Sequence, residues 1–215
     1  MKIAIIGTGN VGTALGASLV RAGHTVTLTG QDAAKASTAA TQIGAQSGTS
    51  RPSAVETAEV VVLAVPYASV EAVAADIASV VSGKVIIDAT NPLKADFSGL
   101  ATEGGPSGAE RVAALLPTGH VVKAFNTLFA SIQGNPETHG QTLDGLFAGD
   151  DASAKAVVAS LIRSIGLRPV DAGPLSSARE LEALAWLNIS LQLRTGGNWN
   201  SSFVLVGAPD KAIAA

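Results

Sequence analysis

A glycine-rich segment near the N-terminus has the residue types and spacing of a site for the diphosphate of a dinucleotide. Residues Gly7–Gly12 read GTGNVG and follow the apolar run Lys2–Ile6. Gly7 permits a tight turn, Gly9 leaves space where a diphosphate approaches the backbone, and Gly12 lets the next helix pack closely on the strand. Backbone amides and the helix dipole at this turn favour an anion. The predicted diphosphate contacts are Gly7, Thr8, Gly9, Asn10, Val11 and Gly12. The alternative is a strand-to-helix corner without a ligand.

The end of the second predicted strand, His24–Thr29, should face the adenosine ribose. An acidic residue there would favour NAD because it holds the ribose hydroxyls. The strand tip carries neither an acid nor an arginine, and Asp32 is better placed to cap the next helix. The residues available to a 2′-phosphate are Thr29, Gly30, Gln31, Lys35 and Arg51. We therefore predict NADP as the cofactor, with NAD possible.

Three further apolar runs end in small or amide residues. These ends are Ala64-Val65-Pro66-Tyr67, Thr90-Asn91-Pro92-Leu93 and Ala124-Phe125-Asn126-Thr127. Because ligands bind at the carboxyl ends of parallel strands, we expect these segments to line the nicotinamide ribose and ring. The predicted cofactor contacts here are Ala64, Val65, Pro66, Asn91 and Pro92. Ordinary turn chemistry is the alternative for each segment taken alone.

The sequence shows no arrangement of side chains for acid–base catalysis. His24 and His120 precede predicted strands and His139 lies in a polar loop, so we interpret all three as turn or solvated residues. Tyr67 is the only tyrosine, and Lys123 lies within a strand with no partner that the sequence identifies. Clustered histidines or acids that could form a metal site are not visible either. We therefore identify no catalytic residue and predict no metal.

Acidic pairs later in the chain have simpler interpretations. Asp150 and Asp151 precede a predicted helix, so capping and the helix dipole explain them. Glu180 and Glu182 point to different faces of a helix, and we expect both to be solvated. A dinucleotide site without a proton-transfer residue favours hydride transfer between two cofactors, in which the protein mainly holds two rings in contact.

The elements that must position these residues alternate along the chain. Apolar runs without polar alternation are typical of parallel strands covered on both faces, and alanine-rich segments between them are typical of helices. The predicted strands are Lys2–Ile6, His24–Thr29, Val60–Val65, Lys84–Asp88, His120–Ala124, Leu143–Ala148 and Arg168–Asp171, with a weak one near 44–49. This pattern predicts an α/β fold, a doubly wound and mostly parallel Rossmann sheet with a small C-terminal helical or irregular extension. We place an NAD(P)-binding domain at residues 1–172 and a helix and tail that complete an acceptor pocket at 173–215.

Composition excludes several classes of function. The chain has 215 residues, 47% of them hydrophobic and 4% aromatic, so its core is aliphatic. The net charge of −3 without a basic block argues against nucleic acid or an anionic membrane as partner. The absence of cysteine excludes disulfides and thiolate chemistry. We see no signal peptide and no membrane-spanning stretch, and we expect a cytoplasmic protein.

Several segments in order resemble one family. These are AIIGTGNVG, VVVLAVPY, KVIIDATNPL, VVKAFNTL, FAGDDASAK and RPVDAGPLSSARELE. The chain is similar to the NADP-dependent reductases of the 5-deazaflavin coenzyme F420, and more distantly to the reductase domains of membrane metalloreductases. The resemblance covers the chain from Met1 to about Leu187, and VKAFNTL and DAGPLSSAR make it fairly specific. At Gly30–Asp32 the chain departs from the Ser-Arg-Arg sequence usual in that family.

The resemblance implies direct hydride transfer between NADP(H) and coenzyme F420, commonly in a homodimer. It places the second ring beside Asn126, Thr127 and Leu128, with the region of Leu175 and the tail closing that pocket. In the tail, Trp199 lies among asparagines and could stack on a ring. Because the deazaflavin is acidic, we expect a local basic patch. The candidates for that patch are Lys123, Arg168, Arg179 and Arg194.

Two alternatives stay open. The first is an NAD(P)H-dependent reductase of a flavin, a ferric chelate or a small carbonyl compound. The second is a nucleotide-binding sensor without turnover.

Overall fold

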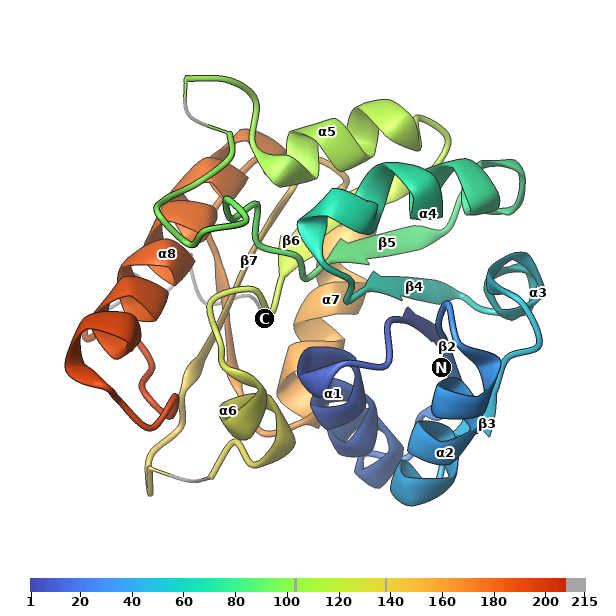
Figure 1. Ribbon diagram of the computed structural model, residues 1–215, viewed down its shortest axis with the longest axis horizontal. Helices are drawn as coiled ribbons and strands as arrows, with labels where there is room; N and C mark the ends of the chain where they lie inside the picture. The colour runs from blue at the N-terminus through green and yellow to red at the C-terminus, as the bar shows by residue number, and fades with distance from the viewer. Residues whose placement is uncertain (103, 138, 208–215) are drawn as a thin grey trace.

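One sheet organises the part of the chain that the computed structural model describes, residues 1–102, 104–137 and 139–207. Its strands are β1 (Lys2–Ile6), β2 (Thr25–Thr29), β3 (Gln46–Ser47), β4 (Val60–Leu63), β5 (Val85–Asp88), β6 (His120–Ala124), β7 (Asp144–Gly149) and β8 (Arg168–Asp171). They lie in the order β3-β2-β1-β4-β5-β6-β7-β8 (Figure 1). All neighbours are parallel except β6 and β7. The predicted doubly wound, mostly parallel α/β sheet is confirmed.

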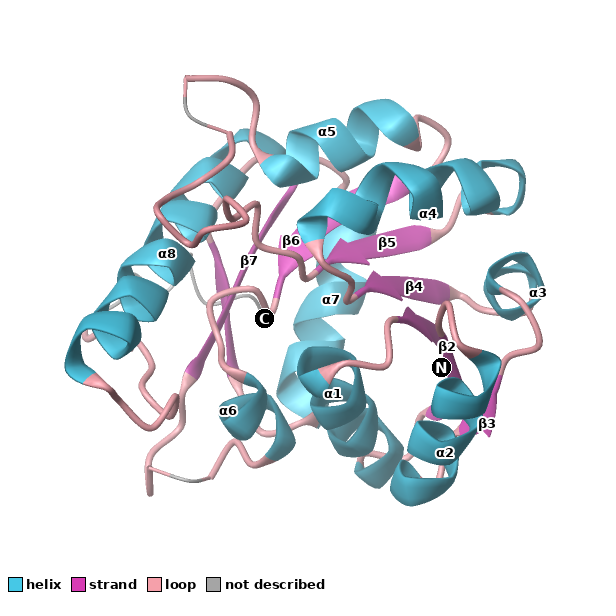
Figure 2. Ribbon diagram, viewed as in Figure 1, coloured by secondary structure: helices cyan, strands magenta, loops and turns pink. Residues whose placement is uncertain are grey.

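Helices cover both faces of this sheet (Figure 2). They are α1 (Asn10–Arg21), α2 (Ala33–Ile43), α3 (Arg51–Glu56), α4 (Val70–Ile77), α5 (Gly108–Leu115), α6 (Ala130–Gly134), α7 (Ala152–Ser164) and α8 (Ala178–Thr195). Short 3-10 turns are η1 (Tyr67–Ser69), η2 (Ala78–Val80) and η3 (Leu175–Ser177). The sequence pattern did not predict α3, α5 and α6, which have six, eight and five residues. Helices of five or six residues are too short to establish a 3.6-residue period.

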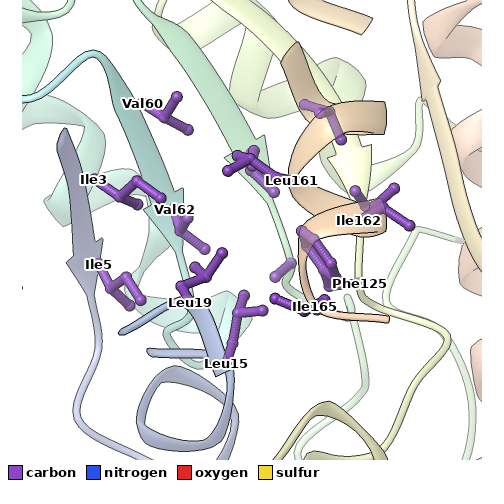
Figure 3. Close-up of a cluster of buried hydrophobic side chains, with 14 of the residues drawn as sticks. Ile3, Ile5, Leu15, Leu19, Val60, Val62, Phe125, Leu161, Ile162 and Ile165 are labelled. Atoms are coloured by element: carbon purple, nitrogen blue, oxygen red, sulfur yellow. The ribbon is translucent and has the colours of Figure 1, made fainter. Parts of the chain in front are cut away.

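Alternate residues of the central strands pack into two separate core layers, one on each face of the sheet. Ile3 and Ile5 of β1 pack with Leu15 and Leu19 of α1 and with residues of α7, as Figure 3 shows. The intervening residues of the same strand face α4 and α5 instead. Period-two alternation of a strand buried on both faces produces this division. The sheet is therefore held rigidly from both sides, and the carboxyl ends of β1, β2, β4, β5 and β6 share one edge.

Helix α5 begins with a reciprocal capping box. The Ser107 hydroxyl accepts from the Glu110 amide at 3.1 Å, and the Glu110 carboxylate accepts from the Ser107 amide at 2.7 Å. The Ser107 amide, and to a smaller extent Arg179, holds the pKa of Glu110 below its usual value. Since the folded-state pKa is lowered, this carboxylate stabilises the fold above its ordinary pKa, and the contribution is lost as the pH falls through the folded-state value.

Glu110→Gln should therefore lower the free energy of unfolding by about 0.5–1 kcal/mol at neutral pH. The difference from the wild type should shrink as the pH falls below the ordinary glutamate pKa, and it should vanish once the folded-state carboxylate is protonated as well. Urea unfolding of both proteins across this range measures the effect. A difference that stays constant or grows on acidification would show that the charge of Glu110 does not stabilise the cap.

Candidate dinucleotide site

The turn between β1 and α1 is built around glycines that cannot carry a side chain. Gly7 has a φ of 130°, donates its amide to the Thr29 carbonyl at 2.8 Å, and would place a Cβ 2.0 Å from the Ala64 carbonyl oxygen. A Cβ on Gly12 would lie 2.1 Å from the carbonyl oxygen of Gly7. Both positions need glycine for close packing of backbone on backbone, as the sequence predicted.

Gly9 differs from these two glycines because its surroundings are open. A Cβ built there meets no atom within 4 Å. Gly9 is also the N-cap of α1, which has no side-chain cap and no acidic residue in its first turn. Helices α2 and α7, by contrast, are capped by Asp32 and Asp151. The start of α1 thus combines uncapped amides, the positive end of a helix dipole and open space, which fits the diphosphate of a dinucleotide.

A groove of about 570 Å³ runs from this turn along the carboxyl edge of the sheet. The predicted residues that line it are Gly7, Thr8, Gly9, Gly30, Gln31, Ala64, Val65 and Pro66. Further lining comes from η1 and α4, through Ala68, Ser69, Ala72 and Val73, which the sequence analysis did not single out. Thr29 is buried beneath the groove, and Lys35 is exposed on α2 and does not line it.

Arg51 supplies the cation that the end of β2 lacks. It stands at the start of α3 and lines the same groove as Gly30 and Gln31. Its guanidinium forms an ion pair with Asp76. Its Nε is buried and has no hydrogen-bond partner among the described residues. Of the two cations considered from the sequence, Arg51 is therefore the one that reaches the groove.

A second, larger groove shares Thr8 and Gly9 with the first and has a volume of about 920 Å³. It lies along α1, between the end of α2 on one side and Phe129–Ser131 with the tail on the other. Trp199 of the tail packs edge-on against Phe129, with ring centroids 5.3 Å apart, and its carbonyl accepts from the Ser131 hydroxyl at 2.6 Å. The structure thus brings Trp199 to the same glycine turn as the nucleotide groove, together with Asn10 and Val11.

Two asparagines join the ends of β5 and β6. Asn126 Nδ2 donates to Asn91 Oδ1 at 3.1 Å, and Asn91 Nδ2 donates to the Asn126 carbonyl at 3.0 Å. Asn126 follows Phe125, whose φ of 65° is rare for a residue with a side chain. Gln133 holds this turn because its Nε2 donates to the carbonyls of Phe125 and Leu128 at 2.9 and 2.8 Å.

Four residues expected beside the second ring are buried, and the structure divides them: Asn126, Thr127, Leu128 and Leu175. Leu128 packs in the core layer that contains α1 and α7, whereas Leu175 packs in the opposite layer with α4 and α5. Asn126 and Thr127, which directly follow β6, are 5% and 6% exposed. Pro92 is buried beside the half-buried Asn91. The roles of these residues at a ring stay predictions, and residues 208–215 of the predicted tail lie outside the described residues.

Lys123 has partners that the sequence did not reveal. The side chain is completely buried, and its Nζ donates to Asp88 Oδ2 at 2.9 Å and to the Thr90 carbonyl at 2.7 Å. It also lies 2.9 Å from Glu182 Oε1 of α8. Glu182 is 1% exposed, so the expectation that it is solvated was wrong. Glu180 is exposed, as expected. A detectable signal was present: Asp88 and Lys123 are charged residues in otherwise apolar strands, and they are register partners.

The expected basic patch is not assembled at the site. Lys123 is sealed in the interior, so its assignment to a surface patch was wrong. Arg168 pairs with Asp144 and Arg179 with Glu110, while Arg194 lies in the last turn of α8. In the described residues no group of three metal-binding side chains occurs. No described helix has the length and hydropathy needed to cross a membrane.

These features define a protein of the Rossmann class, whose members bind dinucleotides at the carboxyl edge of the sheet. Comparison with known proteins narrows the class. Residues 2–92 match the family model described as NADP oxidoreductase, coenzyme F420-dependent. The chain is 36% identical to the F420-dependent NADP reductase of Methanothermobacter thermautotrophicus over 212 residues, which covers 90% of each chain. The chain belongs to the family of F420-dependent NADP reductases.

Two further relatives bear on the same assignment. The crystal structure of an Arthrobacter sp. FB24 protein, described provisionally as an F420-dependent NADP reductase, superposes with a TM-score of 0.88 at 30% identity and covers 96% of this chain and 99% of that one. Metalloreductase STEAP3 of Rattus norvegicus is 32% identical over 187 residues. That match covers 85% of this chain but only 36% of the metalloreductase. The resemblance noted from the sequence is confirmed.

Proposed function

We propose that this protein is an NADP-dependent oxidoreductase that transfers a hydride between NADP(H) and the 5-deazaflavin coenzyme F420. The observation that carries the proposal is the uncapped start of α1 at the open position Gly9, in a chain whose family relatives span nearly its whole length. Bound NADPH supplies the hydride, and a deazaflavin ring accepts it. The diphosphate is held by Gly7–Gly12, and the nicotinamide side by Val65, Pro66, Asn91 and Pro92.

The acceptor belongs on the side of the glycine turn where the second groove opens. Trp199 and Phe129 form an aromatic wall there, suited to contact with a flat ring. In this proposal, residues 1–172 hold the nucleotide, and the segment from residue 173 onward completes the acceptor pocket. A cytoplasmic location remains a prediction that cell fractionation can test.

One assay distinguishes this activity from its rivals. The protein is mixed with NADPH and oxidised coenzyme F420, and the absorbances of both are followed. Equal loss of the two supports the proposal. Loss of NADPH only with a flavin, a ferric chelate or a carbonyl compound would point to another reductase. Tight nucleotide binding without reduction of any acceptor would point to a sensor.

We propose that the adenosine 2′-phosphate lies near Thr29–Gln31 and that Arg51 provides its charge. Gln31→Arg should then raise the affinity for NADP about tenfold and leave that for NAD nearly unchanged, because a charged hydrogen bond to phosphate contributes roughly 1.5–3 kcal/mol. Arg51→Gln should lower the affinity for NADP by a similar factor. Isothermal titration with both nucleotides measures the ratio, and Lys35→Gln is the control on a cation outside the groove. An unchanged NADP/NAD ratio in both groove variants would contradict the assignment.

We propose that the protein works as a homodimer that buries the outer face of α8. Large apolar side chains on this helix and the following tail are exposed, and a second copy of the chain would remove them from water. They are Leu187, Leu191, Leu193, Leu205 and Val206. Leu187→Lys with Leu191→Lys should convert the dimer into a monomer in size-exclusion chromatography with light scattering. Leu115→Lys, on α5, is the control; a monomeric wild type would refute the proposal.

A further inference from the structure

A closed network of buried charges connects the sheet to α8 beside the paired asparagines. Lys123 of β6 donates to Asp88 and to the Thr90 carbonyl, and it forms an ion pair with Glu182. The network holds two carboxylates against one ammonium. The start of α5 offsets this excess negative charge. The amides of Gly108 and Ala109 there donate to the Glu182 carboxylate at 3.0 and 3.2 Å. The positive end of that helix stabilises the second negative charge.

The network fixes the backbone immediately before Asn91. The Thr90 carbonyl accepts from Lys123, and the Thr90 amide donates to Asp88 Oδ1 at 3.0 Å. Both backbone groups of this residue are therefore bound to the charged cluster. Thr90 is 3% exposed, so water cannot easily replace these bonds. The position of Asn91 depends on them because it is the next residue in the chain.

The same turn of α8 fixes Asn126. The Leu181 carbonyl accepts from Asn126 Nδ2 at 3.1 Å, and Glu182, the next residue, forms the ion pair with Lys123. One helical turn thus binds the ammonium and the asparagine pair together. A shift of α8 would move both of the loops that follow β5 and β6.

We propose that Lys123, Asp88 and Glu182 are positioning residues for hydride transfer. They set the geometry of the Asn91 loop, which in the function proposed above flanks the nicotinamide, and of the Asn126 loop, which the family resemblance places beside the second ring. They also couple that geometry to α8. Ring-to-ring transfer depends steeply on distance and angle, so small displacements of these loops should slow the chemical step more than they weaken nucleotide binding.

Glu182→Gln is the decisive variant because it removes one charge without leaving an unpaired one. The remaining Lys123 and Asp88 balance each other, and the glutamine oxygen can still accept from α5. Glu180→Gln is the matched control, an identical change at an exposed position of the same helix. Asp88→Asn tests the network from the strand side. NADP affinity is measured by titration, and the single-turnover rate from NADPH to coenzyme F420 by stopped flow.

We expect Glu182→Gln and Asp88→Asn to slow the single turnover by about 10²-fold while the affinity for NADP changes by less than about threefold. Glu180→Gln should match the wild type. A normal transfer rate in a folded Glu182→Gln protein would overturn the proposal, as would parallel losses of rate and affinity, which indicate general structural damage.

Amide hydrogen exchange provides a readout that needs no acceptor. In Glu182→Gln, exchange should accelerate at residues 89–93 and 125–128 and remain unchanged in β1, β2 and α1. This result holds even if the wild type reduces no deazaflavin, so a failure of the proposed function is distinguishable from a failure of the positioning role. Unchanged exchange in both loops would overturn the positioning role by itself.

Discussion

Gly9→Glu is expected to abolish NADP binding and leave the fold intact. The new side chain has room, since a Cβ at this position meets no atom within 4 Å. Its carboxylate would occupy the space in front of the uncapped amides of α1, where the diphosphate belongs. Two like charges about 4 Å apart repel by roughly 4 kcal/mol at the effective dielectric constant near a protein surface, which corresponds to a loss of about 10³-fold in affinity.

Isothermal titration with NADP measures this loss, and thermal unfolding verifies the fold. Gly9→Ala is the matched control, because it adds only a methyl group in open space and should weaken binding far less. Gly12 is the opposite case, because a Cβ there would lie 2.1 Å from the Gly7 carbonyl oxygen and must disturb the backbone. Retention of NADP affinity in a folded Gly9→Glu protein would remove the diphosphate site from the start of α1.

Asp144→Ala should produce the largest loss of stability among the changes considered. Asp144 is 1% exposed and accepts from Arg168 Nε and Nη2 at 2.6 and 2.9 Å. It also accepts from the Leu205 amide at 2.7 Å, and the Leu205 carbonyl accepts from Arg168 at 2.8 Å. Removing the carboxylate leaves a partly buried guanidinium without its counter-ion and an amide of the tail without its hydrogen-bond acceptor. We expect the free energy of unfolding to fall by about 3 kcal/mol.

The hydrogen bonds that Arg168 donates to Asp144 raise the pKa of Arg168 above its usual value. A raised folded-state pKa means that the stabilisation is present below the ordinary arginine pKa and lost only above it. The loss in Asp144→Ala should therefore be equal at neutral and mildly alkaline pH in urea unfolding. Asp76→Ala breaks an exposed ion pair instead and should cost less than about 1 kcal/mol. Equal losses in the two variants would contradict a special role for Asp144.

The central strands of the sheet were predictable because apolar residues dominate them. Val60–Leu63 and His120–Ala124 lie where their composition indicated, and the glycine turn followed from spacing and context. The short helices were not predicted because capping residues, such as Ser50 before α3, define them better than any periodicity does. The antiparallel direction of β7 leaves no mark in its own sequence, since it depends on the path of the loop that precedes it.

The candidate dinucleotide site was predictable from the sequence only where its residues lie close together in one segment. Gly7–Gly12 is such a segment, whereas Arg51 reaches the nucleotide groove from a helix that the sequence pattern did not reveal. Glu182 looked like a solvated helical residue because charge alone does not disclose a partner on a strand about sixty residues earlier. Long-range pairing of this kind depends on tertiary structure, and only the juxtaposition of β6 and α8 makes it visible.

The burial of Lys123 between two carboxylates has a consequence for the evolution of the family. Replacing any single member of the cluster leaves a charge or a hydrogen-bond donor without a partner in the dry interior. A viable lineage should therefore exchange Asp88, Lys123 and Glu182 jointly, for instance for an apolar trio of similar volume. Drift at one of these three sites is constrained by the residues at the other two.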